Sequence, residues 1–100
     1  MTRPLRIEFP GAIYHLTSRG DRREPIFEVD SDRAALLSVL EQSMQLFDVE
    51  VLAYCLMDNH DQFVLQTHRA NLSRLMRHLN GVYTQAFNRR HRKVVHMFQG

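Results

Sequence analysis

Residues 49–67 read VEVLAYCLMDNHDQFVLQT, and this stretch decides the fold. Residues 49–57 and 60–67 are both rich in strand-forming residues, and Asp58-Asn59 between them is a pair that favours a tight turn. Two such runs joined by two turn residues are typical of a β-hairpin. The two strands are therefore expected to be antiparallel neighbours in one sheet.

The second strand of this hairpin alternates in polarity, and the alternation assigns its two faces. Successive side chains of a strand point to opposite sides, so one face carries His60, Gln62, Val64 and Gln66 and the other carries Asp61, Phe63, Leu65 and Thr67. The face of Phe63 and Leu65 must meet the helices. Asp61 then points its carboxylate toward the core side, where loss of hydration opposes its charge.

Further strands and two helices are predicted around the hairpin. Residues 12–18, AIYHLTS, follow Pro10-Gly11 and form a first strand, and the basic segment RGDRREP after it is a loop. A helix of about 17 residues begins at Asp30 or Ser31. Its apolar positions at helical spacing are Ala34, Leu37, Leu40, Met44 and Phe47.

The second helix is the clearest element of the sequence. Asn71 is its expected N-cap, and its apolar positions recur every three or four residues: Leu72, Leu75, Met76, Leu79, Val82, Tyr83, Ala86 and Phe87. The opposite face of this helix is polar and cationic. A short last strand is expected over residues 94–98.

The predicted order is strand, helix, strand, strand, helix, strand. This order favours an α+β fold of the ferredoxin-like, split βαβ type, with a four-stranded antiparallel sheet and two helices on one face. The other face of such a sheet is uncovered and available to a ligand.

Length and composition limit the remaining possibilities. One hundred residues suit one domain, residues 1–100, and 44% hydrophobic with 24% charged residues is ordinary for a globular protein. No apolar stretch approaches the roughly 18 residues of a membrane span, and the first residues lack the apolar core of a signal peptide. We therefore expect a cytoplasmic protein without a membrane partner. Cys55 is the only cysteine, which is expected to be a buried structural thiol.

The charge is divided unevenly along the chain. Residues 1–68 carry six Lys or Arg and all 11 acids, a net of −5, whereas residues 69–100 carry seven Lys or Arg and no acid. An acid-free basic block favours a polyanionic partner such as nucleic acid. A solvated basic helix face is the alternative interpretation.

His60 and Gln62 are the candidate metal ligands. Side by side on the open face, two residues apart on one strand, they could hold one divalent cation of the kind used in phosphate chemistry. From the residues alone, a single histidine near a turn is more often an ordinary surface residue.

Three longer stretches carry a family resemblance. They are RPLRIEFPGAIYHLTSRGDRREPIF at 3–27, YCLMDNH at 54–60, and NLSRLMRHLNGVYTQAFNRRH at 71–91 followed by HMFQG at 96–100. In these stretches the chain resembles the amino-terminal part of the REP-associated tyrosine transposases, which belong to the single-strand transposases named for a His-hydrophobic-His motif. The resemblance implies a ferredoxin-like domain that binds single-stranded DNA hairpins and cleaves one strand with a tyrosine nucleophile, forming a 5′-phosphotyrosine. It also implies a magnesium or manganese ion on the two motif histidines.

The resemblance also shows where this chain departs from the family. His60 matches the first motif histidine, Gln62 stands in place of the second, and Asp61 stands in place of the hydrophobic residue. An amide oxygen binds a hard cation less strongly, so the metal site is expected to be weakened. The family's nucleophile lies beyond the FQG stretch at which this sequence stops, and Tyr14, Tyr54 and Tyr83 are expected to be structural. We therefore expect a chain that binds DNA without cleaving it on its own, and no catalytic residue is assigned.

The expected DNA contacts form two groups. In the resembling family the first strand and its following loop approach the foot of the DNA hairpin, which makes Arg19, Arg22 and Arg23 expected contacts. The second helix contributes Arg74, Arg77, Arg89 and Arg90, which a solvated helix face would explain almost as well. Homodimerisation is left open. Two alternatives also remain: a ferredoxin-like RNA-binding module, which would need exposed aromatics where this open face offers His15, Thr17 and Gln66, and a domesticated remnant that acts through a protein partner.

Overall fold

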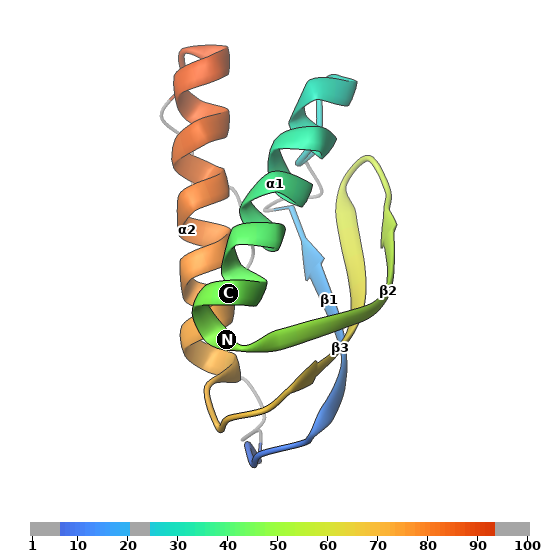
Figure 1. Cartoon of the computed structure of the whole chain (residues 1–100). Coiled ribbons are helices and arrows are strands. Elements are labelled where there is room, and N and C mark those ends of the chain that lie inside the picture. The colour runs from blue at the N-terminus through green and yellow to red at the C-terminus, as the bar shows by residue number, and fades with distance from the viewer. Residues whose placement is uncertain (1–6, 21–24, 94–100) are drawn as a thin grey trace.

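The computed structural model describes residues 7–20 and 25–93, which form three strands and two helices (Figure 1). In chain order the elements are β1 (Ile13–Arg19), α1 (Asp30–Phe47), β2 (Val49–Leu56), β3 (His60–Thr67) and α2 (Leu72–His91). The predicted α+β class is confirmed, with one antiparallel sheet and two helices. The fourth strand predicted over residues 94–98 lies outside the described residues, so the sheet described has three strands.

The central strand of the sheet is β3. The strand order is β1-β3-β2, and both neighbours pair with β3 in antiparallel orientation, as the split βαβ prediction requires. The pairing with β2 shifts at Leu52, because Val51 pairs with Leu65 whereas Ala53 pairs with Val64. The extra residue makes a β-bulge, which bends β2 along the edge of the sheet.

The alternation predicted for β3 is confirmed. Phe63 and Leu65 are 1% and 0% exposed, whereas His60 and Gln62 are only partly buried. Both helices lie on the same side of the sheet, and no described element covers the other side (Figure 1). The prediction of one covered and one open face therefore holds for the part of the chain that is described.

The apolar face of α2 lies where the sequence predicted it, with buried residues Leu72, Leu75, Leu79, Tyr83 and Phe87. Asn71 is the N-cap residue of α2, as predicted, but the expected capping bond of its side chain is absent. The Asn71 side chain makes no cap hydrogen bond and instead donates from Nδ2 to the carbonyl oxygen of Phe47, 2.8 Å away. The helix start is satisfied by Glu8, whose carboxylate accepts the backbone N–H and the hydroxyl of Ser73 at 2.9 Å each. An acidic group there also complements the positive end of the helix dipole.

The apolar face of α1 is rotated from the predicted one. Its buried residues are Asp32, Leu36, Val39, Leu40 and Ser43. Of the predicted positions only Leu40 is buried, since Ala34 is exposed and Leu37, Met44 and Phe47 are partly buried. The difference arises because α1 also packs against α2, a contact that the helix's own sequence does not reveal.

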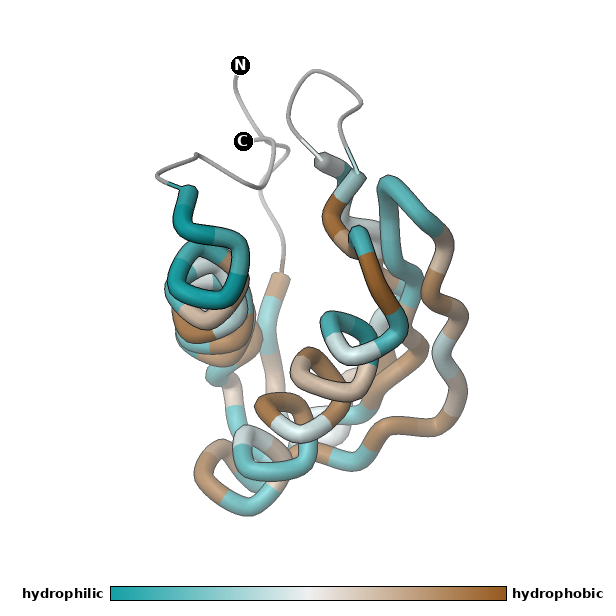
Figure 2. The backbone as a smooth tube through the Cα atoms, turned by 90° about the horizontal axis from the view of Figure 1, so that it is seen from above, coloured by the Kyte–Doolittle hydropathy of each residue, from teal (hydrophilic) through white to brown (hydrophobic). Residues whose placement is uncertain are grey.

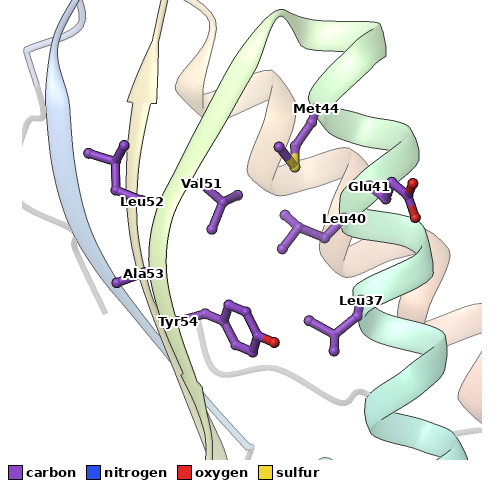
Figure 3. A pocket seen from close by; sticks show the side chains of 8 residues that line it. All are labelled: Leu37, Leu40, Glu41, Met44, Val51, Leu52, Ala53 and Tyr54. Carbon is purple, nitrogen blue, oxygen red and sulfur yellow. The ribbon is translucent and has the colours of Figure 1, made fainter.

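Leu37, Leu40 and Met44 instead line a groove of about 520 Å³ between α1 and β2, facing Val51 and Tyr54 (Figure 3). Tyr54 is 55% exposed at its mouth, although we expected it in the structural core. Cys55 is also exposed, which contradicts the predicted buried thiol. Tyr54 is exposed because β2 is an edge strand, and Cys55 is exposed because it pairs with Gln62 on the open face of the sheet. Neither helix has an apolar run long enough to cross a membrane within the described residues.

A buried carboxylate joins the beginning of α1 to the end of α2. Asp32 is 0% exposed, and its two oxygens lie 2.9 Å from Nε2 of His91, and Oδ2 accepts the backbone N–H groups of Glu28 and Val29 at 2.9 and 3.1 Å. Burial raises the pKa of Asp32, but these hydrogen bonds outweigh burial, and the net pKa lies below 3.8. Glu28 binds the other ring nitrogen of His91 at 3.1 Å, so the imidazole is held between two carboxylates.

We expect Asp32→Ala to lower the free energy of unfolding by about 3 kcal/mol at pH 7, because it leaves His91 and its neighbours without their buried partner. The matched control is Asp30→Ala in the same helical turn, whose fully exposed carboxylate should contribute far less. Because the pKa of Asp32 is lowered on folding, its contribution is present above pH 3.8 and should disappear as the pH falls through the folded-state pKa. Urea denaturation at several pH values measures both effects, and equal losses in the two variants at pH 7 would contradict this role.

Candidate nucleic-acid interface

The candidate site lies on the open face of the sheet, where β1 ends and β3 begins. In the sheet register Arg19 lies opposite His60, and Thr17 lies opposite Gln62. Paired residues of antiparallel strands project from the same face, so these four side chains form one polar surface. The structure thus brings one predicted DNA contact, Arg19, next to both predicted metal ligands.

The turn between β2 and β3 holds both ends of the loop that follows β1. The carbonyl oxygen of Asn59 accepts the N–H of Gly20 at 2.8 Å, and that of Asp58 accepts the N–H of Ile26 at 2.9 Å. The Asp58 carboxylate pairs with Arg33 of α1 at 2.7 Å. The polar residues of the turn are therefore used to fix the loop ends beside the open face.

The predicted contacts Arg22 and Arg23 belong to this loop and lie outside the described residues. Because Gly20 and Ile26 are both bound to the turn, the loop leaves and rejoins the fold beside His60.

His60 and Gln62 share one face, as predicted, but one ring nitrogen of His60 and the amide oxygen of Gln62 already have partners. His60 Nδ1 lies 2.9 Å from Oδ1 of Asn59, and Gln62 Oε1 lies 3.3 Å from Nε2 of His15. No group of three His, Cys, Asp or Glu side chains suited to a metal occurs among the described residues. The two residues are thus an incomplete donor set, and a divalent cation there would need most of its ligands from water or phosphate.

His15 and Thr17 belong to this surface but were not among the predicted site residues. His15 lies on β1 opposite Val64 of β3, two residues before Thr17. Its side chain reaches diagonally across to Gln62. The alternation of side chains along the first predicted strand had already assigned His15 to the open face. Only the strand register shows that it contacts Gln62.

Asp61 lies between the two candidate ligands and points into the protein, as predicted. It is 2% exposed, and its Oδ1 atom has no hydrogen-bond partner within the described residues. Burial raises the pKa of Asp61 to about 7, while hydrogen bonds from Ser18 oppose this rise only in part. The family position that is hydrophobic therefore holds a carboxyl group that is poorly compensated.

The tyrosines of the described residues are not placed as nucleophiles on the open face. Tyr83 is fully buried and donates its hydroxyl to the carbonyl oxygen of Ile26 at 2.5 Å. Burial and the nearby charge of Asp32 raise the pKa of the Tyr83 phenol, which makes it a weaker source of phenolate. Tyr14 donates to Ile7 at 3.3 Å, and Tyr54 faces the groove beside α1.

The predicted arginines of α2 lie apart from the open face. Arg74, Arg77 and Arg89 are exposed on the side of α2 opposite its buried residues, and the turns of α2 near its carboxyl end are hydrophilic (Figure 2). Arg90 differs from them, since its Nε atom lies 3.4 Å from Oδ1 of the buried Asp32. The fold therefore keeps the two predicted groups apart, with Arg19 in an open-face set and the arginines of α2 in a helix set.

Comparisons with known proteins agree with the family resemblance and with the described fold. The family model described as "Transposase IS200 like" matches residues 9–100. A solved structure of a REP-associated tyrosine transposase bound to a REP hairpin superposes with a TM-score of 0.81 at 15% sequence identity, which shows a shared fold. The match covers 99% of this chain and 58% of that chain, so this chain spans just over half of its length. No curated protein matches the sequence.

The raised pKa of Asp61 predicts a pH-dependent stability. Between pH 3.8 and about 7 the unfolded chain releases this proton while the folded protein keeps it, so folding should become less favourable as the pH rises through this range. The loss from this group should be on the order of 2–4 kcal/mol by pH 7.5. Asp61→Val should remove this part of the slope and be more stable than the parent at pH 7.5, but not at pH 4.

The matched control is Asp61→Asn, which keeps the shape and removes the charge, and it should flatten the same part of the slope. Thermal and urea unfolding at pH 4, 5.5 and 7.5 compare the three proteins. Identical pH slopes in the parent and both variants would show that Asp61 is ionised at no cost in the folded state.

Proposed function

Since the chain belongs to the IS200-like transposase family, as the resemblance of its sequence had indicated, we propose that it is a DNA-transposition domain that binds a DNA hairpin with an unpaired flank. The observation that carries the proposal is the register of Arg19 with His60 on the uncovered face of the sheet. This places a guanidinium beside the family's histidine position, where a phosphate of a single strand can reach both. The solved structure that shares this fold is bound to a hairpin, which supports the choice of ligand.

The chemistry of the open face suits an unpaired strand. Its central rows carry an imidazole, a hydroxyl, an amide and a guanidinium, from His15, Thr17, Gln62 and Arg19. These groups can donate to phosphate oxygens and to base edges, which in a single strand are not occupied by pairing. The described residues of this face include no phenylalanine or tyrosine, so the stacking platform expected of an RNA-binding module of this fold has no support there.

We also propose that the domain has the fourth strand that the sequence predicts. In the described sheet β1 is an edge strand, which is where the fourth strand of a ferredoxin-like sheet would pair. A strand added at that edge would widen the sheet and leave its open face accessible. We also propose that the domain acts in the cytoplasm, and a homodimer is not required for the contacts above.

We propose His60 and Gln62 as the residues that would hold a divalent cation, with low affinity. When bound, such a cation would polarise a phosphate oxygen. Gln62 would first have to give up its bond to His15, which adds a cost beyond the weaker affinity of an amide oxygen. Because the described tyrosines are structural, we propose that binding, rather than cleavage by these tyrosines, is what this part of the chain does to DNA.

Binding should depend on Arg19 and on single-stranded character. A labelled hairpin with an unpaired flank should bind more tightly than a blunt duplex of equal length, and Arg19→Ala should weaken hairpin binding roughly tenfold because it removes a charge-assisted hydrogen bond to phosphate. The slope of log affinity against log salt should fall by about 0.7 for each single-strand phosphate that the variant no longer neutralises.

The matched control is Arg74→Ala, which removes an exposed arginine from the helix set and should change hairpin affinity less than Arg19→Ala does. Fluorescence anisotropy titrations at several salt concentrations measure each value. Equal affinity for hairpin and duplex, or equal effects of the two substitutions, would contradict the proposed binding surface.

The metal proposal is tested separately with manganese. Gln62→His should tighten Mn²⁺ binding at least severalfold, because an imidazole replaces an amide that is already bonded to His15. His60→Ala should abolish the gain when combined with Gln62→His. Electron paramagnetic resonance titration of free Mn²⁺ follows both, and unchanged binding in Gln62→His would remove this pair as the cation site.

A further inference from the structure

An apolar groove between α1 and β2 is covered by no described element. It has a volume of about 520 Å³, and Leu37 and Met44 of α1 face Val51 and Tyr54 of β2 across it (Figure 3). The Tyr54 side chain is 55% exposed, and the other three are only partly buried. A partner that covered these side chains would gain binding energy by removing their apolar surface from water.

The outer edge of β2 offers backbone hydrogen bonds beside this groove. In the described sheet β2 pairs only with β3, so the N–H and C=O groups along its other edge have no strand partner there. An exposed edge of this kind can pair with an extended segment of another molecule. The bulge at Leu52 interrupts the edge, so its regular part beside the groove is residues 53–56, which include Tyr54.

The charge around the groove is negative. Residues 34–67, which contain the lining residues of both elements, carry five Asp or Glu and no Lys or Arg. Glu41 lines the groove and Asp48 lies at the turn from α1 to β2, and both are exposed. The last turn of α1 has no basic residue, so the negative end of its helix dipole adds to these charges. A partner with Lys or Arg is therefore favoured.

The same charges oppose two other occupants. A phosphate backbone would be repelled by the acidic rim, which makes DNA a poor ligand for this groove. A second copy that paired its own β2 edge here would bring Glu41 and Asp48 close to their counterparts, and like charges would face each other.

We propose that the groove between α1 and β2 binds an extended, basic segment of a partner protein, which adds to the outer edge of β2 as a further strand. Side chains two residues apart on this segment point to the same face and are apolar, so that they enter the groove beside Tyr54. Its Lys or Arg side chains reach the rim at Glu41 and Asp48. This surface is distinct from the proposed DNA contacts, which lie on the open face where β1 pairs with β3, and binding at the two surfaces should be independent.

The probe is a fluorescein-labelled peptide of about eight residues in which valine alternates with lysine. Fluorescence anisotropy should show saturable binding to the parent chain, and a peptide with glutamate in place of lysine should bind at least about fivefold more weakly. Amide chemical shifts of the isotope-labelled chain should change along β2 and in the part of α1 that lines the groove, and not along β1. An excess of the DNA hairpin should not displace the peptide.

A charge reversal tests the acidic rim. Glu41→Lys should weaken binding of the lysine peptide about fivefold and tighten binding of the glutamate peptide. The matched control is Asp30→Lys, which makes the same charge change at an exposed position about 16 Å away along α1 and should alter either affinity less than twofold. Equal effects of the two substitutions would show that only net charge matters and would overturn the proposed surface.

Backbone methylation tests the added strand. Two further peptides carry N-methyl groups on either every valine or every lysine, which blocks the N–H groups along one edge of the extended peptide or along the other. Only one edge faces β2, so one of these peptides should lose binding and the other should keep it. Loss in both or in neither would overturn strand addition. Failure of the lysine peptide to bind, its displacement by the hairpin, or a dimer of the parent that Tyr54→Ser dissociates would overturn the proposal as a whole.

Discussion

The alternation of side chains along β3 is the constraint on which the rest of the structure depends. β3 is the central strand, so its register fixes both neighbours at once, and its two faces differ sharply. Phe63 and Leu65 need burial, which obliges both helices to lie on their side. A shift of one residue would expose this pair and bury His60 and Gln62. The open polar surface is thus a consequence of the same pattern that builds the core.

Asp32 and Asp61 are both buried carboxylates, but their pKa values shift in opposite directions. Asp32 has two backbone N–H groups, an imidazole and a guanidinium around it, and its pKa falls despite complete burial. Asp61 has only Ser18 to oppose desolvation, and its pKa rises to about 7. Asp32 therefore stabilises the packing of α1 against α2 at neutral pH, whereas Asp61 weakens the strand that presents the site. A hydrophobic residue at position 61 would serve the fold better, because Oδ1 of the acid has no hydrogen-bond partner within the described residues.

The sequence predicted those features that depend on local periodicity and failed where a distant partner decides. The hairpin, the two faces of β3 and the buried stripe of α2 follow from spacings within one element, and all are confirmed. The α1 stripe was wrong because Asp32 is buried by His91, 59 residues away along the chain. The contact of His15 with Gln62 likewise joins residues 47 apart and needs the strand register.

The other differences between prediction and structure arise from the exposure of β2 and from side-chain contacts between residues far apart in the sequence. Strand propensity distinguishes neither an edge strand from a central one nor the open face from the covered one. Tyr54 and Cys55 were therefore assigned to the interior, although Tyr54 lies at the sheet edge and Cys55 lies on the open face. Asn71 has the residue type of an N-cap, but the better acceptor at that helix start is Glu8, 65 residues before Ser73. Composition alone also grouped Arg90 with the other arginines of α2, whereas its Nε atom pairs with the buried Asp32.

The separation of the two cationic sets has a consequence for how DNA would be held. The described residues extend over 38 × 30 × 20 Å, and even the shortest of these lengths exceeds the Debye length of about 8 Å at physiological ionic strength. Exposed charges on the outer side of α2 are therefore largely screened from a phosphate at Arg19. They can attract DNA from a distance, or contact a part of a longer molecule that extends around the domain, but they add little to the binding of a strand on the open face. For a strand held on the open face as proposed, discrimination between DNA sequences would come from the donors and acceptors of that face, because phosphate contacts fix position without reading the bases.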